Sequence, residues 1–126
     1  MAQGQKVAHP RRGEIYLVAF DPTVGREIKK TRPALIVQND VGNRYGDLTI
    51  VAAITSKISP VLYPVEVIVQ PSRANGLQLL SAILLDQVRT VDRRRLIRRL
   101  GAIDPSTLRR VDDAIRVSLG LIEIVL

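Results

Sequence analysis

The chain of 126 residues contains no cysteine, no tryptophan and a single histidine, His9. Without cysteine there is no disulfide, no thiolate metal site and no thiol nucleophile. One histidine, in a polar leader, excludes a pair of catalytic histidines and a multi-histidine metal site within one chain. The sequence therefore predicts no metal site and no cofactor, and its lack of disulfides is typical of a reducing cytoplasm.

Aromatic residues are also scarce, at 3% of the chain. They are Tyr16, Phe20, Tyr45 and Tyr63. The core must therefore be aliphatic, which argues against aromatic-cage readers and against single-strand binders that use extended stacking platforms. No apolar run approaches the ~20 residues that span a bilayer, and residues 1–6 lack the apolar core of a signal peptide. We expect no membrane segment and a cytoplasmic protein.

The chain has fewer acidic than basic residues. The chain has 12 Asp and Glu against 19 Lys and Arg, a formal net charge of +7. This excess favours a polyanionic partner, nucleic acid before membrane, because no basic amphipathic helix dominates the pattern. The alternative is that the charge serves solubility alone.

At this length and 46% hydrophobic content, we expect a flexible leader over residues 1–10 and a single domain over residues 11–126.

The apolar pattern predicts a mainly β protein with a few helices. Five segments have the apolar runs or alternation of strands between turn signals: 14–20, 33–37, 48–54, 65–69 and 82–91. Residues 42–47 are rich in turn formers and are expected to be a loop. Five short strands favour a small, strongly curved antiparallel sheet or barrel with a helix packed on it.

The C-terminal part differs from the rest. Asp104-Pro105 is a helix start signal, and apolar residues then recur at helical spacing up to Leu119, followed by Gly120 as a stop. The spacing predicts a C-terminal helix, and residues 93–100 are expected to form a shorter basic helix. Residues 121–126 resemble a strand and are expected to pair within the fold or across a dimer.

A charged loop leads into the second predicted strand. Residues 25–33 carry four cations and one carboxylate, and Pro33 pushes Arg32 toward an extended conformation. An arginine held at the root of a strand, with Glu27 upstream, suits recognition of a phosphate or chemistry on one. The alternative is a surface ion pair between Arg32 and Glu27.

The order of these pieces resembles the MazF/PemK family of toxin endoribonucleases. The resemblance runs from about Arg12 to Leu121. It rests on the segments 12–16, 21–27, 31–40, 53–56, 64–67 and 81–92, followed by Arg95-Leu96. It implies a small SH3-like antiparallel β-barrel of the CcdB/MazF/PemK type, acting as a homodimer. It also implies sequence-specific, metal-independent cleavage of single-stranded RNA, mainly mRNA, and neutralisation by a cognate acidic, MazE-like antitoxin.

The resemblance implies three catalytic residues. Arg32 matches the catalytic arginine, whose guanidinium can stabilise charge on a pentacoordinate phosphorus. Thr55 matches the second catalytic position, where its hydroxyl can donate to a phosphate oxygen; the alternative is a strand-end threonine bonding its own backbone. Glu27 is a candidate base for the ribose 2′-hydroxyl, provided that its surroundings raise its pKa, or else it only orients Arg32.

Further residues of the matching segments are candidates for RNA binding. They are Lys30, Asn39, Ser56, Gln87 and Arg89. The amides of Asn39 and Gln87 can read base edges, or else make ordinary strand-end and loop hydrogen bonds. Arg89 can contact phosphate, or else pair with a nearby aspartate. The spacer 28–31 departs from the glycine-containing spacer of many relatives, so no recognition sequence is carried over.

Two rival functions are compatible with the same sequence. The first is a non-enzymatic toxin of the same fold that poisons DNA gyrase, as the CcdB family does with a tryptophan near its C-terminus, which this chain lacks. The second is a basic SH3-like nucleic-acid-binding module.

Because the sequence offers neither a metal site nor a pair of histidines, the remaining route for RNA cleavage is attack by the 2′-hydroxyl on the adjacent phosphorus. This reaction gives a 2′,3′-cyclic phosphate and a 5′-hydroxyl.

Overall fold

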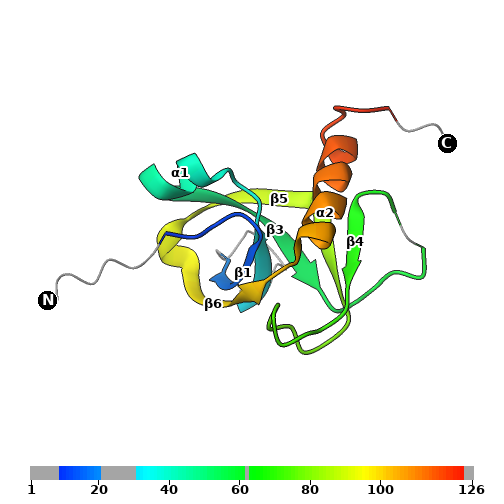
Figure 1. Ribbon diagram of the computed structural model, residues 1–126, viewed down its shortest axis with the longest axis horizontal. Helices are drawn as coiled ribbons and strands as arrows, with labels where there is room; N and C mark the ends of the chain where they lie inside the picture. Colours follow the sequence, from blue (N-terminus) through cyan, green and yellow to red (C-terminus); the bar gives the residue numbers. More distant parts are fainter. Residues whose placement is uncertain (1–8, 21–30, 62, 124–126) are drawn as a thin grey trace, which may run out of the picture.

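A computed structural model describes residues 9–20, 31–61 and 63–123, and the described residues form one antiparallel sheet of six strands (Figure 1). The sheet order is β4-β5-β3-β2-β1-β6. The strands are β1 (Glu14–Ala19), β2 (Thr31–Ile36), β3 (Leu48–Thr55), β4 (Glu66–Val69), β5 (Ser81–Asp92) and β6 (Leu96–Ala102). Two helices, α1 (Asp40–Tyr45) and α2 (Pro105–Ser118), and one 3-10 turn, Arg93–Arg95, complete the described part. The prediction of a mainly β protein with a C-terminal helix is confirmed.

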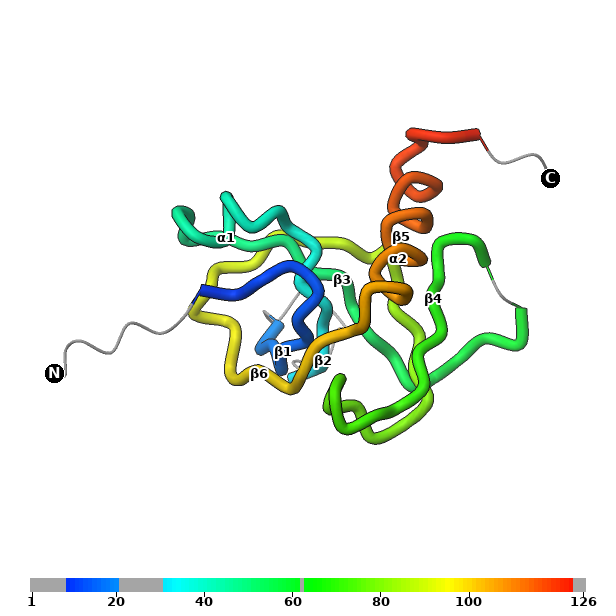
Figure 2. Tube along the Cα trace, in the orientation of Figure 1, coloured from blue at the N-terminus to red at the C-terminus, as the bar shows by residue number. Residues whose placement is uncertain are grey.

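The sheet curves strongly but does not close into a barrel. Within the described ranges β4 and β6 are the two edges and do not pair with each other. Figure 2 shows the loop between β4 and β5 running beside the end of β6, where the Ala102 N–H donates to the Ala74 carbonyl at 2.9 Å. The two backbones approach so closely that a Cβ on Gly101 would collide with the Ala74 carbonyl. This loop, rather than a strand, bridges the gap.

Two local predictions are corrected, and a third falls partly outside the described residues. Residues 93–100 are not a helix but a 3-10 turn followed by β6, because the backbone of Leu96, Arg98 and Arg99 pairs with β1. The expected loop over 42–47 overlaps α1, which Asn39 caps by accepting from the Gly42 N–H at 2.8 Å. Residues 121–123 are not in a strand of this single chain, and residues 124–126 lie outside the described part, so the pairing of 121–126 across a dimer stays a prediction.

The core is aliphatic, as the composition predicts. One cluster of buried residues packs between the sheet and α2, and includes Ile15, Leu35, Ile83 and Val111. A second lies on the other face of β1 and β2 and includes Val18. No aromatic side chain occurs among the buried hydrophobic residues of the described ranges. Helix α2 begins where the sequence predicts, with the Asp104 carboxylate accepting from the Thr107 N–H at 2.7 Å, which lowers the pKa of Asp104.

Arg12 ties the N-terminal segment to both helices. Its N–H donates to Asp40 of α1 at 2.7 Å, which lowers the pKa of that carboxyl group, and its guanidinium contacts Asp112 of α2 at 2.6 Å. It also donates to the Val37 carbonyl at 2.9 Å. These bonds hold β1 in place from its first residue. None of the helices formed by the described residues is long and apolar enough to span a membrane.

Candidate active site

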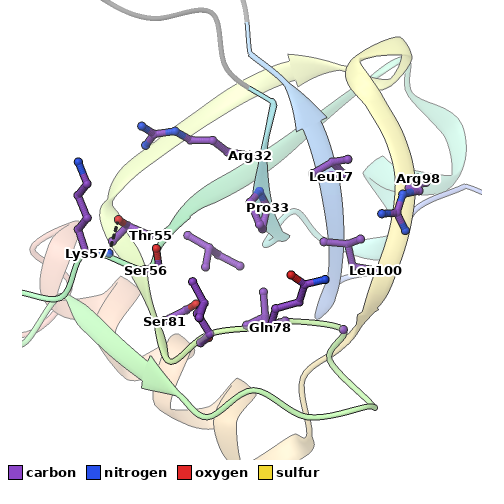
Figure 3. A pocket seen from close by; sticks show the side chains of 14 residues that line it. Leu17, Arg32, Pro33, Thr55, Ser56, Lys57, Gln78, Ser81, Arg98 and Leu100 are labelled. Atoms are coloured by element: carbon purple, nitrogen blue, oxygen red, sulfur yellow. Dashed lines mark hydrogen bonds between the residues drawn. The ribbon is translucent and has the colours of Figure 1, made fainter.

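A cavity of about 570 Å³ opens where the ends of β2 and β3 meet β1, β6 and the loop before β5 (Figure 3). Its lining comes from five parts of the chain that are distant in sequence. The lining residues are Leu17, Arg32, Pro33, Ile54, Thr55, Ser56, Lys57, Gly76, Leu77, Gln78, Leu79, Ser81, Arg98 and Leu100. The cavity thus has apolar walls and carries polar side chains from several elements.

The pairing of β2 with β3 brings Arg32 and Thr55 together. Ala34 is the register partner of Ala53, and continuing this antiparallel register by two residues places Arg32 opposite Thr55. Neighbouring strands lie about 5 Å apart, so the two side chains share one rim of the cavity. The arginine and the threonine singled out from the sequence therefore lie at the same site.

Arg32 is exposed at this rim and is free to meet an anion. Within residues 9–20, 31–61 and 63–123 its guanidinium makes no hydrogen bond or ion pair. Its proposed partner Glu27 lies outside the described residues, as does Lys30. The catalytic role of Arg32 is therefore argued from the chemistry of its guanidinium and from similarity to related proteins, and not from a contact with Glu27.

Thr55 is held in a defined orientation. Its Oγ1 accepts a hydrogen bond from the Lys57 N–H at 3.1 Å, so the strand-end bond expected as an alternative is present. This bond uses a lone pair and leaves the hydroxyl proton available for a phosphate oxygen. Ser56 adds a second hydroxyl, and Lys57 adds an ammonium group at the same rim.

The opposite wall contains residues that sequence reasoning missed. Arg98 and Leu100 reach the cavity from β6, and Gln78 and Leu79 from the loop before β5. Assigning residues 93–100 to a helix concealed Arg98 as a site residue. The spacing of Arg98 and Leu100 was the available signal, because alternate residues of a strand share one face.

The cavity is electropositive. Three cationic side chains, Arg32, Lys57 and Arg98, contribute to the lining, and the lining residues that the structure describes include no carboxylate and no histidine. Those described ranges also contain no group of three or more His, Asp or Glu side chains placed to hold a metal ion. An anion with several oxygen atoms is the ligand that this arrangement fits best.

The remaining predicted RNA-binding residues lie away from the cavity lining. Asn39 caps α1. Gln87 and Arg89 are exposed on β5, with the Arg89 guanidinium 5.1 Å from the centre of the Phe20 ring. Of the predicted binding residues, Ser56 alone is placed in the described lining. The roles of the other three stay predictions about a more extended surface.

Comparison with known proteins identifies one family and a relative that covers most of the chain. The sequence model of the "PemK-like, MazF-like toxin of type II toxin-antitoxin system" family matches residues 11–119. Endoribonuclease EndoA of Bacillus subtilis is 40% identical over 113 residues, covering 90% of this chain and 97% of that protein.

Solved structures agree with this match. The crystal structure of MazF from Deinococcus radiodurans superposes with a TM-score of 0.73 at 25% identity, over 90% of this chain and 98% of that one. A mycobacterial endoribonuclease in complex with its cognate antitoxin gives a TM-score of 0.72 at 25% identity, over 91% and 99%. The likeness therefore extends over nearly the whole of each chain.

Proposed function

Because the chain belongs to the PemK-like, MazF-like toxin family of type II toxin–antitoxin systems, we propose that it is an endoribonuclease toxin that cleaves single-stranded RNA, mainly mRNA, at specific sequences. The observation that carries this proposal is the placement of Arg32 and Thr55 on one rim of an electropositive cavity. A cytoplasmic location, where transcripts are found, belongs to the same proposal.

The proposed reaction uses the substrate's own nucleophile. The 2′-hydroxyl oxygen attacks the adjacent phosphorus and loses its proton, the bond from phosphorus to the 5′-oxygen breaks, and that oxygen gains a proton. The products are a 2′,3′-cyclic phosphate and a 5′-hydroxyl. Arg32 stabilises the negative charge that grows on the non-bridging oxygens, and Thr55 donates to one of them. Glu27 remains the proposed base or the group that orients Arg32.

The proposed protein partner is an antitoxin with an acidic segment. Two observations support it: the net charge of +7 and the structural likeness to toxins solved with their antitoxins, among them MazE–MazF from Deinococcus radiodurans at 26% identity. An acidic segment fits a cavity that presents three cations. Homodimer formation belongs to the same proposal, and light scattering measures it directly.

The decisive test is to incubate the protein with a long transcript in EDTA and to sequence the resulting ends. We expect discrete cuts at a short common sequence, with cyclic phosphate and 5′-hydroxyl ends, at the rate seen without EDTA. RNA that is retarded in a gel but stays intact would instead indicate a binding module. Cleavage that disappears in EDTA would contradict the metal-independent route. Inhibition of DNA gyrase with intact RNA would support the remaining rival.

Replacing Thr55 by valine tests the hydroxyl separately. Valine keeps the shape and removes the donor, so we expect single-turnover cleavage to slow about a hundredfold. Thr55→Ser restores the hydroxyl and is expected to recover most of the rate. Equal rates for the valine variant and the wild type would show that the hydroxyl takes no part in the reaction.

A further inference from the structure

We propose that Arg98 binds a second backbone phosphate of the RNA, distinct from the phosphate that is cleaved beside Arg32. This inference deepens the proposed function and rests on it. The cavity then holds the RNA backbone at two points on opposite walls. Arg98 serves to bind and align the strand, and takes no part in the bond that breaks.

The position of Arg98 follows from the pairing of three strands. Leu17 of β1 is the register partner of Pro33 of β2 on one side and of Arg98 of β6 on the other. Register partners present their side chains on the same face of a sheet, so all three turn toward the cavity that they line. Figure 3 shows the guanidinium of Arg98 turned toward the cavity from the wall opposite Arg32, with Leu17 and Pro33 between them.

Arg98 is exposed and has no structural partner in the described part of the chain. Other arginines nearby do have partners. The adjacent Arg99 donates to the Glu14 carboxylate at 2.8 Å, and Arg94 donates to Asp92 at 3.0 Å. A guanidinium that faces an apolar-walled cavity without a counter-charge leaves its donors available to a ligand.

Phosphate is the ligand group that suits these donors. A guanidinium presents a planar fork that binds two oxygens of one phosphate, and the RNA backbone carries one such group per nucleotide. Arg32 and Arg98 lie on strands separated by β1, so two strand spacings, about 10 Å, separate their backbones. Two like charges on opposite walls fit two successive or next-nearest phosphates better than one shared phosphate.

The test compares Arg98→Met with Arg110→Met. Arg110 is exposed on α2 and does not line the cavity, so its variant removes the same charge elsewhere. The probe is a short RNA that spans a cut site mapped with the wild type, with a 2′-deoxy sugar that blocks cleavage. For Arg98→Met we expect about tenfold weaker binding. We also expect the slope of log affinity against log salt to become shallower by about 0.7, the value for one phosphate of a single strand that the protein no longer neutralises.

A second arm identifies the phosphate. Each phosphate of the probe is replaced in turn by a neutral methylphosphonate. We expect one position, other than the scissile one, to weaken wild-type binding and to leave Arg98→Met binding unchanged. On cleavable RNA, Arg98→Met should raise KM while kcat stays near the wild-type value.

Several results would overturn the inference while leaving the proposed function intact. One is binding by Arg98→Met equal to that of Arg110→Met. Another is that, at every position of the probe, the methylphosphonate weakens binding by the same factor in Arg98→Met as in the wild type. A third is weaker binding confined to RNAs with one particular base and an unchanged salt dependence, which would make Arg98 a base reader. If the wild type cuts no transcript, the proposed function fails and this inference fails with it.

Discussion

Replacing Arg32 with alanine is expected to slow single-turnover RNA cleavage about a thousandfold, the largest effect of any single change at the site. The guanidinium is the cation placed with Thr55 at the junction of β2 and β3, and it has no hydrogen bond or ion pair in the described part of the chain that would give it a structural role. Its removal takes away charge stabilisation that is strongest when phosphorus is pentacoordinate. Binding of cleavage-blocked RNA is therefore expected to fall much less than the rate.

Arg32→Lys separates charge from geometry. Lysine keeps the positive charge but replaces the planar fork by a point charge, so we expect only a small part of the rate to return. Arg110→Ala, which removes an exposed arginine away from the cavity, is expected to cleave at the wild-type rate. Because Arg32 is exposed, thermal unfolding of Arg32→Ala should match the wild type. Cleavage by Arg32→Ala within tenfold of wild type would remove Arg32 from the mechanism.

Gly76→Ala is expected to produce the largest loss of stability, about 3 kcal/mol more than Gly120→Ala in the free energy of unfolding. The two glycines have nearly the same backbone conformation, with φ of 73° and 72°, so the strain of placing alanine in the left-handed region is common to both. A Cβ on Gly76 would lie 2.7 Å from the carbonyl carbon of Leu100 and would collide with its oxygen, whereas a Cβ on Gly120 meets nothing within 4 Å. The difference in unfolding free energy between the two variants therefore measures the cost of the collision alone.

The collision bears on the site because Gly76 holds the loop before β5 against β6. Leu77 and Gln78 follow it in the cavity wall, and Leu100 lines the cavity from the other side. Urea unfolding of both variants gives the free energies, and cleavage rates at low temperature show whether the wall is displaced. If the two variants unfold at the same urea concentration, the loop yields without cost and does not fix the distance between the walls.

Much of the fold can be predicted from local patterns. The strands β1 to β5 and the helix α2 follow from alternation or runs of apolar residues between turn signals, and the Asp104-Pro105 cap marks the start of α2. The helix predicted over 93–100 was wrong because a run of arginines has no period that distinguishes a strand edge from a helix face. Pairing with β1 decided that segment, and pairing depends on residues about 80 positions away.

The order of short motifs along the chain was enough to predict the family, and with it Arg32 and Thr55 as candidates. Their proximity follows from one hairpin-like pairing, between β2 and β3, which are close in sequence. By contrast, Arg98 and Gln78 join the site through contacts of β6 with β1 and with the loop before β5. Those contacts involve residues whose local sequence carries no sign of the partner.

The amino-acid sequence by itself determined the aliphatic core, the positions of most strands, the C-terminal helix and the absence of thiol chemistry, because each depends on composition or on neighbours a few residues away. Only the tertiary structure decided that the sheet stays open and that Arg98 faces the cavity opposite Arg32. The physical reason is that strand register between distant segments is set by the packing of whole faces against a core. A one-residue shift in that register turns every side chain of the strand to the other face.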